Sequence, residues 1–414
     1  DLNRFAVRTK PNIVYILADD LGYGDISSLN PDSKIKTPNV DRMAASGMRF
    51  TDAHSGSAVC TPTRYGVLTG RYAFRSELKR GVLKGYSKPL IPTYRATVAS
   101  FLKQQDYNTA CIGKWHLGWD WPIGADDRPF LVPNTKPDTV ADDRHRAAWQ
   151  RVFSQPIAGG PTARGFDHYF GTDVPNWPPF CFIEDDRTVG IPSEFLPARL
   201  LGNNQASVQG PALKDWTLEP ILPALGDRAV RFIRDASRDS QPYFLYMPLT
   251  APHTPLAVNR KWQGASGLNT YADFVMETDA VVGRVLETID NSGTAERTLV
   301  LFTSDNGYNM GHHGITGKGN GTYPMNMYEE SVKVPFIANC PGRIPAGVVN
   351  ADLVSHYDFM PTILDCVGLE NPEADKLPGR SFAPLLKGER LAARDTVVVY
   401  DEYGPVRMIR DERW

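Results

Sequence analysis

The sequence predicts an α/β fold in which a mostly parallel central sheet is flanked by helices. Two patterns predict it: short, continuously apolar runs that suit buried parallel strands, and intervening stretches whose apolar residues recur near helical spacing. The clearest strand is residues 12–18 (NIVYILA), a run that stops abruptly at two aspartates. The other expected strands are residues 109–112, 243–247 and 298–303, and the expected helices are residues 40–46, 227–236 and 271–289.

Polar side chains follow two of these strands at the point where each one ends. Asp19 and Asp20 follow the first strand, and Asp305 and Asn306 follow residues 298–303. In parallel α/β sheets, ligands gather at the carboxyl ends of the strands. We therefore expect a site assembled from segments that lie far apart in the sequence.

The character of the chain changes near its end. Residues 396–400 (TVVVY) and 406–409 (VRMI) flank a connection that contains Gly and Pro, which predicts a pair of strands. We therefore expect a large α/β domain over residues 1–390 and the start of a small C-terminal subdomain over residues 391–414.

Composition excludes several classes of partner. The chain has 414 residues, 45 of them Lys or Arg and 47 Asp or Glu, without long runs of one sign, so we expect neither a nucleic-acid nor an anionic-membrane partner. No stretch approaches the roughly 20 apolar residues that span a bilayer. The sequence starts at Asp1 without a signal-peptide pattern, so we expect that a leader, if one existed, has been removed.

The five cysteines are widely spaced, with no CxxC pair and no zinc-finger spacing, so neither a zinc structure nor a dense disulfide framework is indicated.

Cys60 opens the segment Cys-Thr-Pro-Thr-Arg, in which a Pro suits the first turn of a helix and Gly70 lies near its end. A helix N-terminus favours an anion, and Arg64 would project on a similar side. Taken alone, Cys60 is more often a small buried hydrophobe and Arg64 a surface cation.

The complete pattern, Cys-x-Pro-x-Arg followed by Leu-Thr-Gly-Arg at residues 68–71, resembles the signature of the formylglycine-dependent sulfatases. The resemblance extends from Asn12 to about Asp401. It implies an alkaline-phosphatase-like fold with a mixed central sheet. It also implies that a formylglycine-generating enzyme oxidises Cys60 to an aldehyde. Sulfatases of this kind continue into a C-terminal subdomain with an antiparallel sheet and a helix, which we expect to be truncated here.

The residues at the strand ends form a candidate metal site. Asp19 and Asp20 alone are usually a solvated turn or a helix cap, but with Asp305 and Asn306 they supply only oxygen ligands, which suit Ca²⁺ or Mg²⁺ and not Zn²⁺. The resemblance implies Ca²⁺, with the group derived from Cys60 as a further ligand.

Four further residues lie in motifs that match the family. They are Lys114 and His116 (GKWHLG), His253 (APHTP) and Lys318 (GKGNG). In isolation, the pair Lys114 and His116 would more often be solvated or structural, and a structural loop histidine is an equally good reading of His253. The glycine-rich stretch around Lys318 is not a phosphate loop, because the spacing of its glycines is wrong and no Ser or Thr follows the lysine.

The resemblance also implies a division of roles. A hydroxyl of the hydrated aldehyde attacks sulfur, its deprotonation promoted by Asp305 and the metal. Arg64, Lys114 and Lys318 offset the charge on the sulfuryl oxygens. His253 protonates the departing alcohol, and His116 takes the proton whose loss expels sulfate.

The substrate is less visible in the sequence. Residues 319–330 and 401–407 look similar to bacterial sulfatases that act on carbohydrates, so we expect a sulfated sugar or polysaccharide. The candidate substrate contacts are aromatic and histidine side chains near the motifs, and packing or solvent exposure is the alternative for each. They are Trp115, Trp119, Trp177, His312 and His313.

Two alternatives stay open. A phosphonate monoester or phosphodiester hydrolase of the same superfamily can share the signature and the metal site. A carbohydrate- or anion-binding protein whose Cys60 is never oxidised would keep the site without the reaction. A removed leader and a polymeric substrate predict a periplasmic or secreted protein.

Overall fold

A ten-stranded mixed sheet forms the centre of the protein, in a computed structural model that describes residues 10–131, 139–202, 207–400 and 407–411. The strands follow the order β15-β2-β14-β11-β1-β10-β4-β5-β6-β7. Their bounds are β1 Asn12–Ala18, β2 Met48–Phe50, β4 Asn108–Lys114, β5 His168–Thr172, β6 Ile183–Glu184, β7 Arg187–Thr188, β10 Tyr243–Pro248, β11 Thr298–Ser304, β14 Phe336–Asn339 and β15 Val348–Asn350.

The middle of the sheet is parallel. β1 pairs in parallel with β10 and β11, β10 with β4, and β4 with β5, whereas β14 runs antiparallel to β11. Every residue of β1 is buried, and alternate side chains enter different cores: Ile13, Tyr15 and Leu17 face one, and Val14 and Ile16 the other. A strand covered on both faces has to be apolar throughout, which explains its sequence.

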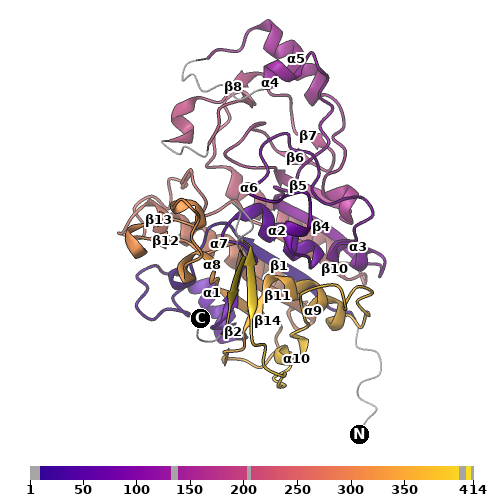
Figure 1. Ribbon diagram of the computed structural model, residues 1–414, viewed down its shortest axis with the longest axis vertical. Coiled ribbons are helices and arrows are strands. Elements are labelled where there is room, and N and C mark those ends of the chain that lie inside the picture. Colours follow the sequence, from indigo (N-terminus) through magenta and orange to yellow (C-terminus); the bar gives the residue numbers. More distant parts are fainter. Residues whose placement is uncertain (1–9, 132–138, 203–206, 401–406, 412–414) are drawn as a thin grey trace.

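Helices cover both faces of the sheet (Figure 1). Those packed into the core that contains Val14 are α1 Pro38–Ala45, α6 Ile221–Ala236 and α7 Thr270–Asn291. Those packed into the core that contains Ile13 include α2 Cys60–Thr69, α3 Val98–Lys103, α5 Asp143–Phe153, α9 Phe359–Cys366 and α10 Ala383–Leu386. The remaining helices are α4 Arg128–Leu131 and α8 Glu329–Val332.

Helix α2 begins at Cys60 and is buried along its whole length. It ends at Gly70, whose φ of 66° is left-handed and whose backbone N–H donates to the Gly66 carbonyl, as is usual where glycine terminates a helix. The sequence predicted both ends.

Short elements complete the fold. The segment with α4, α5 and β8 extends from one end of the molecule in Figure 1. The two-stranded sheets pair β3 Ala53–His54 with β16 Val354–Ser355, β8 Glu194–Phe195 with β9 Pro211–Ala212, β12 Asn309–Met310 with β13 Thr316–Gly317, and β17 Val397–Tyr400 with β18 Arg407–Arg410. The 3₁₀ turns are η2 Tyr23–Asp25, η3 Ala73–Arg75, η4 Pro161–Arg164, η5 Ala198–Leu201, η6 Ala295–Arg297, η7 His312–Gly314, η8 Gly319–Gly321 and η9 His356–Asp358.

The C-terminal strand pair is antiparallel, as predicted. Two arginines attach this end of the chain to the main body. Arg394, just before β17, forms two hydrogen bonds with Asp358, and Arg410 in β18 contacts Asp52 and Glu329. Residues 401–406, part of the stretch that looked similar to carbohydrate sulfatases, lie outside the described residues.

The predicted elements agree with the structure in type and differ at some ends. Helix α6 starts at Ile221, six residues before the expected start at Asp227. Pro223 is tolerated there because it lies in the first turn, where a backbone N–H has no partner within the helix. Within the described ranges, no helix has the length and apolar character needed to cross a membrane.

Candidate functional site

The ends of β1 and β11 bring four oxygen-bearing side chains together. Asp19, Asp20, Asp305 and Asn306 are all buried, and they follow two strands that pair residue by residue up to Ala18 and Ser304. The backbone N–H of Asp20 donates to Asp305 Oδ1 at 3.2 Å, and Asn306 Nδ2 donates to Asp20 Oδ1 at 2.9 Å. Adjacent parallel strands therefore place groups from residues 19 and 305 in one cluster, as the sequence predicted.

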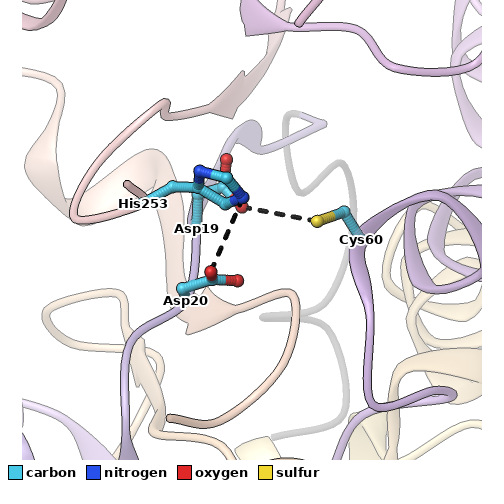
Figure 2. A group of neighbouring side chains, drawn as sticks. All are labelled: Asp19, Asp20, Cys60 and His253. Atoms are coloured by element: carbon cyan, nitrogen blue, oxygen red, sulfur yellow. Dashed lines mark hydrogen bonds and ion pairs between the residues drawn. The ribbon is translucent and has the colours of Figure 1, made fainter. Parts of the chain in front are cut away.

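Cys60 faces this cluster from the N-terminus of α2 (Figure 2). Its Sγ lies 3.8 Å from Asp19 Oδ1, and the side chain is 3% exposed. Lys318 Nζ lies 2.9 Å from the sulfur and 2.6 Å from Asp20 Oδ1, so one ammonium group joins the cysteine to the carboxylates. Burial alone would raise the pKa of the thiol, but the charges of Lys114 and Lys318 outweigh it and hold this pKa well below its usual range.

Arg64 is fully buried one turn into α2. Its Nη2 and Nε donate to Asp305 Oδ2 at 2.7 and 3.2 Å, and its Nη1 donates to the Lys114 carbonyl at 3.0 Å. Burial disfavours the charged guanidinium, but Asp305 and Asp19 raise its pKa above the usual value, so it stays a cation. The alternative of a surface arginine is therefore excluded.

Lys114 ends β4 and is also fully buried, with its Nζ 2.7 Å from Asp19 Oδ2. Burial disfavours ionisation of Asp19. The positive charges of Lys114, His253 and Arg64 nevertheless hold its pKa well below the usual range. Asp19 is therefore a carboxylate at any physiological pH.

His116 lies beside the cysteine. Its Nε2 lies 2.8 Å from the Leu83 carbonyl oxygen, and its ring interacts with Cys60. Burial, followed by the charge of Lys114, lowers the pKa of His116 to about 4. The imidazole is therefore neutral near pH 7 and able to accept a proton.

His253 lies at the more open side of the cluster. Its Nε2 is 3.6 Å from Asp20 Oδ2, and 11% of its side chain is exposed, more than that of any other member of the cluster. Its Nδ1 contacts the Thr254 carbonyl oxygen. A histidine at the edge of a buried charge cluster is suited to exchange a proton with an incoming ligand.

The four oxygen-bearing residues fit a hard divalent cation. Asn306 Oδ1 is buried and has no hydrogen-bond partner within the described part of the chain, which is costly for an amide oxygen unless a cation or water satisfies it. Ligand atoms of Asp19, Asp20, Cys60 and His253 lie within 4.8 Å of one another. Carboxylate and amide oxygens favour Ca²⁺ or Mg²⁺.

Two of the proposed substrate contacts are wrong. Trp115 and Trp119 are 1% and 0% exposed and pack into the core on one face of the sheet, where protein covers both faces of each indole. Trp115 Nε1 donates to the Gly118 carbonyl at 3.1 Å. A ring enclosed in this way cannot stack on a sugar. Trp177 is half-buried.

His312 and His313 are exposed on the loop between β12 and β13. His313 Nε2 lies 3.0 Å from Glu330 Oε2, and its ring stacks on Tyr328. His312 borders a groove of about 930 Å³ that Tyr308 and Lys333 also line. Of the predicted substrate contacts, His312 is thus placed beside an open groove, whereas His313 is held by its neighbours.

The sequence did not reveal three groups that hold His116. They are the Leu83 carbonyl, the Thr61 hydroxyl and Asp173, which accepts from the His116 backbone N–H. Leu83 lies in an irregular connection and acts through its backbone, so no residue type marks it. Thr61 was visible only as the first of the two variable positions of the signature.

A comparison with protein families gives one match that covers most of the chain. The family described as Sulfatase matches residues 11–369. The chain belongs to the sulfatase family. It is therefore a sulfuric ester hydrolase, an enzyme that hydrolyses sulfate esters.

Relatives of this sulfatase include mammalian and bacterial enzymes. Arylsulfatase A of Bos taurus is 35% identical over an alignment of 409 positions, which covers 96% of this chain and 72% of that protein. N-acetylgalactosamine-6-O-sulfatase of Bacteroides thetaiotaomicron is 30% identical over an alignment of 424 positions, which covers 94% of this chain and 79% of that protein.

A solved structure from work on the metabolism of multiple glycosaminoglycans by Bacteroides thetaiotaomicron has the same fold. It superimposes with a TM-score of 0.80 at 26% identity, and the match covers 98% of this sulfatase and 87% of that chain.

Proposed function

We propose that this sulfatase removes sulfate from a sulfated carbohydrate, using Cys60 oxidised to formylglycine beside a bound Ca²⁺. The observation that carries the proposal is the surroundings of Cys60. Its sulfur lies 2.9 Å from one buried ammonium group and 3.8 Å from a buried carboxylate, at the N-terminus of a helix. A cysteine kept only for packing does not need buried charges of both signs around it.

The charges in the cluster suit an anionic ester. Three carboxylates, Asp19, Asp20 and Asp305, lie among three cations, Arg64, Lys114 and Lys318. These fixed charges nearly cancel, so a divalent cation held by Asp19, Asp20, Asp305 and Asn306 would leave the site positive. When bound, Ca²⁺ would supply electrostatic stabilisation of sulfate oxygens.

Oxidised Cys60 would supply a hydrated aldehyde, with one hydroxyl to attack sulfur and a second whose deprotonation expels sulfate. The chain itself supplies the groups that bind and move protons. Lys318 Nζ, which now contacts the sulfur, and Lys114 are positioned to bind sulfuryl oxygens as negative charge develops. His116 is neutral and accepts a proton from residue 60, and His253, at the open side, donates one to the departing alcohol.

The carbohydrate part of the proposal rests on two observations. One relative is named for N-acetylgalactosamine, a sugar, and is similar over 94% of this chain. The groove of about 930 Å³ beside His312 is large enough for sugar rings and is lined by polar side chains that include Asn30 and Asp32, while no residue of the cluster around Cys60 lines it. We also propose that the protein works outside the cytoplasm, where a sulfated polysaccharide would be met. Cell fractionation tests this placement.

The first experiment establishes the state of Cys60. Mass spectrometry of the peptide that contains Cys60 should show a loss of about 18 Da, the difference between a thiol side chain and an aldehyde. The same preparation should release inorganic sulfate from sulfated oligosaccharides, and Cys60→Ser should abolish turnover while substrate still binds. Complete conversion of Cys60 without sulfate release from any sugar sulfate would refute the carbohydrate proposal.

Two alternatives are tested in parallel. If phosphodiesters are hydrolysed orders of magnitude faster than sulfate esters, the chain is a phosphodiester or phosphonate hydrolase within the same superfamily. If Cys60 stays unoxidised in every host and the protein only binds sulfated sugars, it is a binding protein. The buried Arg64, Lys114 and Lys318 around Cys60 favour catalysis over binding alone.

A further inference from the structure

His116 is held at three of its polar groups. Its backbone N–H donates to the Asp173 carbonyl and to Asp173 Oδ1, each at 3.1 Å, and its side-chain Nε2 lies 2.8 Å from the Leu83 carbonyl oxygen. Its own carbonyl accepts from Thr61 Oγ1 at 3.2 Å. The backbone φ of 53° is uncommon for a residue with a side chain, and these bonds explain how it is maintained.

The bond to Leu83 fixes the tautomer of the imidazole. A backbone carbonyl can only accept, so Nε2 must carry the proton, and the lone pair of the neutral ring is then on Nδ1. Nδ1 is buried and has no hydrogen-bond partner within the ranges that the structure describes, and the ring interacts with Cys60. The nitrogen left free as a base is therefore the one available to residue 60.

The position of the Leu83 carbonyl depends in turn on Thr61. The backbone N–H of Leu83 donates to Thr61 Oγ1 at 3.2 Å, and the same hydroxyl donates to the His116 carbonyl. Three hydrogen bonds thus form a closed ring through Thr61, Leu83 and His116. Leu83 lies in an irregular connection between η3 and α3, so no helix or strand holds its carbonyl in place.

We propose that Thr61 is a positioning residue for the proton acceptor: its hydroxyl fixes Leu83, and the Leu83 carbonyl holds His116 with the Nδ1 lone pair toward residue 60. The inference rests on the proposed function, in which His116 takes a proton from residue 60. It assigns a role to the first of the two variable positions of the Cys-x-Pro-x-Arg signature. That role requires a hydroxyl and not merely a small side chain.

Thr61→Val tests the proposal because it keeps the shape of the side chain and removes both hydrogen bonds. Thr61→Ser is the matched control, since it keeps the hydroxyl and loses only a methyl group. Both variants preserve Cys-x-Pro-x-Arg, and mass spectrometry of the Cys60 peptide normalises each rate to the oxidised fraction. We expect kcat of Thr61→Val to fall at least tenfold, within the range for a misplaced general base, and KM to change by less than about twofold. Thr61→Ser should stay within about threefold of the wild type in kcat.

Rapid quenching gives a readout that a general loss of structure would not produce. In Thr61→Val, the first equivalent of alcohol should appear at nearly the wild-type rate while inorganic sulfate appears more slowly, because His116 acts after the alcohol has left. An unchanged kcat in Thr61→Val, or an equal loss in Thr61→Ser, would overturn the proposal.

The tautomer can be measured without turnover. ¹⁵N spectra of labelled wild-type protein, with His116→Gln used to assign the resonance, should show neutral His116 protonated at Nε2. A proton on Nδ1 would overturn the inference even if Thr61→Val does not fold. Because this measurement needs no substrate, it also separates the two proposals. A wild type that releases no sulfate refutes the function, and the tautomer still shows whether the Leu83 carbonyl holds His116 as inferred.

Discussion

Replacing Arg394 with Gln should destabilise the protein, because the change leaves a buried carboxylate without its cation. Arg394 Nη1 and Nη2 each donate to a different oxygen of Asp358 at 2.6 Å, and the two side chains are 11% and 2% exposed. Asp358 also accepts from the backbone N–H groups of Ser355 and Arg380, which the variant keeps. The pair connects the segment before β17 to the turn η9.

The magnitude follows from these contacts. Removing one partner of a buried ion pair costs about 3–5 kcal/mol, and the slight exposure of Arg394 places the expected loss at the lower end, about 3 kcal/mol. Unfolding entropy is about 2.1 cal/mol/K per residue, so a chain of this length loses about 3–4 °C of Tm for that change.

The loss of stability caused by Arg394→Gln should increase as the pH rises. Burial raises the pKa of Asp358, and the charge of Arg394 opposes the rise, so the pKa goes up further in the variant. When folding raises the pKa of a carboxyl group, the unfolded chain loses that proton at a lower pH than the folded chain does. The free energy of unfolding therefore falls as the pH rises, and it falls more when the pKa in the folded state is higher. The difference in Tm between wild type and Arg394→Gln should therefore be small near pH 4 and grow as the pH rises toward 7.5.

Differential scanning fluorimetry at several pH values measures both effects. Arg146→Gln is the control, because Arg146 pairs with Asp143 on an exposed helix surface at 3.2 Å, where an ion pair contributes well under about 1 kcal/mol. A loss below 1 °C for Arg394→Gln at pH 7.5, or a loss that does not change with pH, would show that the reasoning about Asp358 is incorrect.

Three further outcomes are expected. Gly113→Ala should lower Tm by several degrees and disturb the end of β4, because the added methyl group would lie 1.8 Å from the Pro248 carbonyl oxygen. Gly293→Ala is the control: its methyl group would enter open space, so the free energy of unfolding should fall by only about 1–2 kcal/mol, the cost of a positive φ in alanine. Ca²⁺ at about 100 times its Kd should raise the free energy of unfolding of the wild type by about 2.7 kcal/mol, which is measured as a rise in Tm. EGTA should reverse this rise, and Asn306→Ala should not show it. Trp119→Ala should cost about 3–5 kcal/mol in urea unfolding, and a stable variant with weakened sugar binding would contradict the packing role.

Local patterns in the sequence were sufficient to predict most elements. The apolar run of β1 and the glycine after α2 are signals carried by neighbouring residues, and the structure confirms both elements. The early start of α6 was missed because Pro223 ordinarily indicates a break, and its first-turn position is visible only once the helix is seen. The proposed division of the chain at residue 390 stays a prediction.

Prediction of the site succeeded where a strand end or a motif marked a residue. Asp19 and Asp305 could be brought together because adjacent parallel strands end at the same edge. The burial of Trp119 could not be predicted, since it depends on how loops fold over the sheet. The role of the Leu83 carbonyl was equally hidden, because a backbone group in an irregular connection leaves no trace in the choice of side chain.

The burial of Cys60 has a consequence for the order of events during synthesis. The thiol is 3% exposed, and its nearest cation, Lys318, is added to the chain 258 residues later. A modifying enzyme that has to grasp the segment around Cys60 therefore needs it while the chain is still being made or is unfolded. Folding ahead of oxidation would enclose an unreacted thiol, so supplying the formylglycine-generating enzyme after purification should convert denatured protein much faster than native protein.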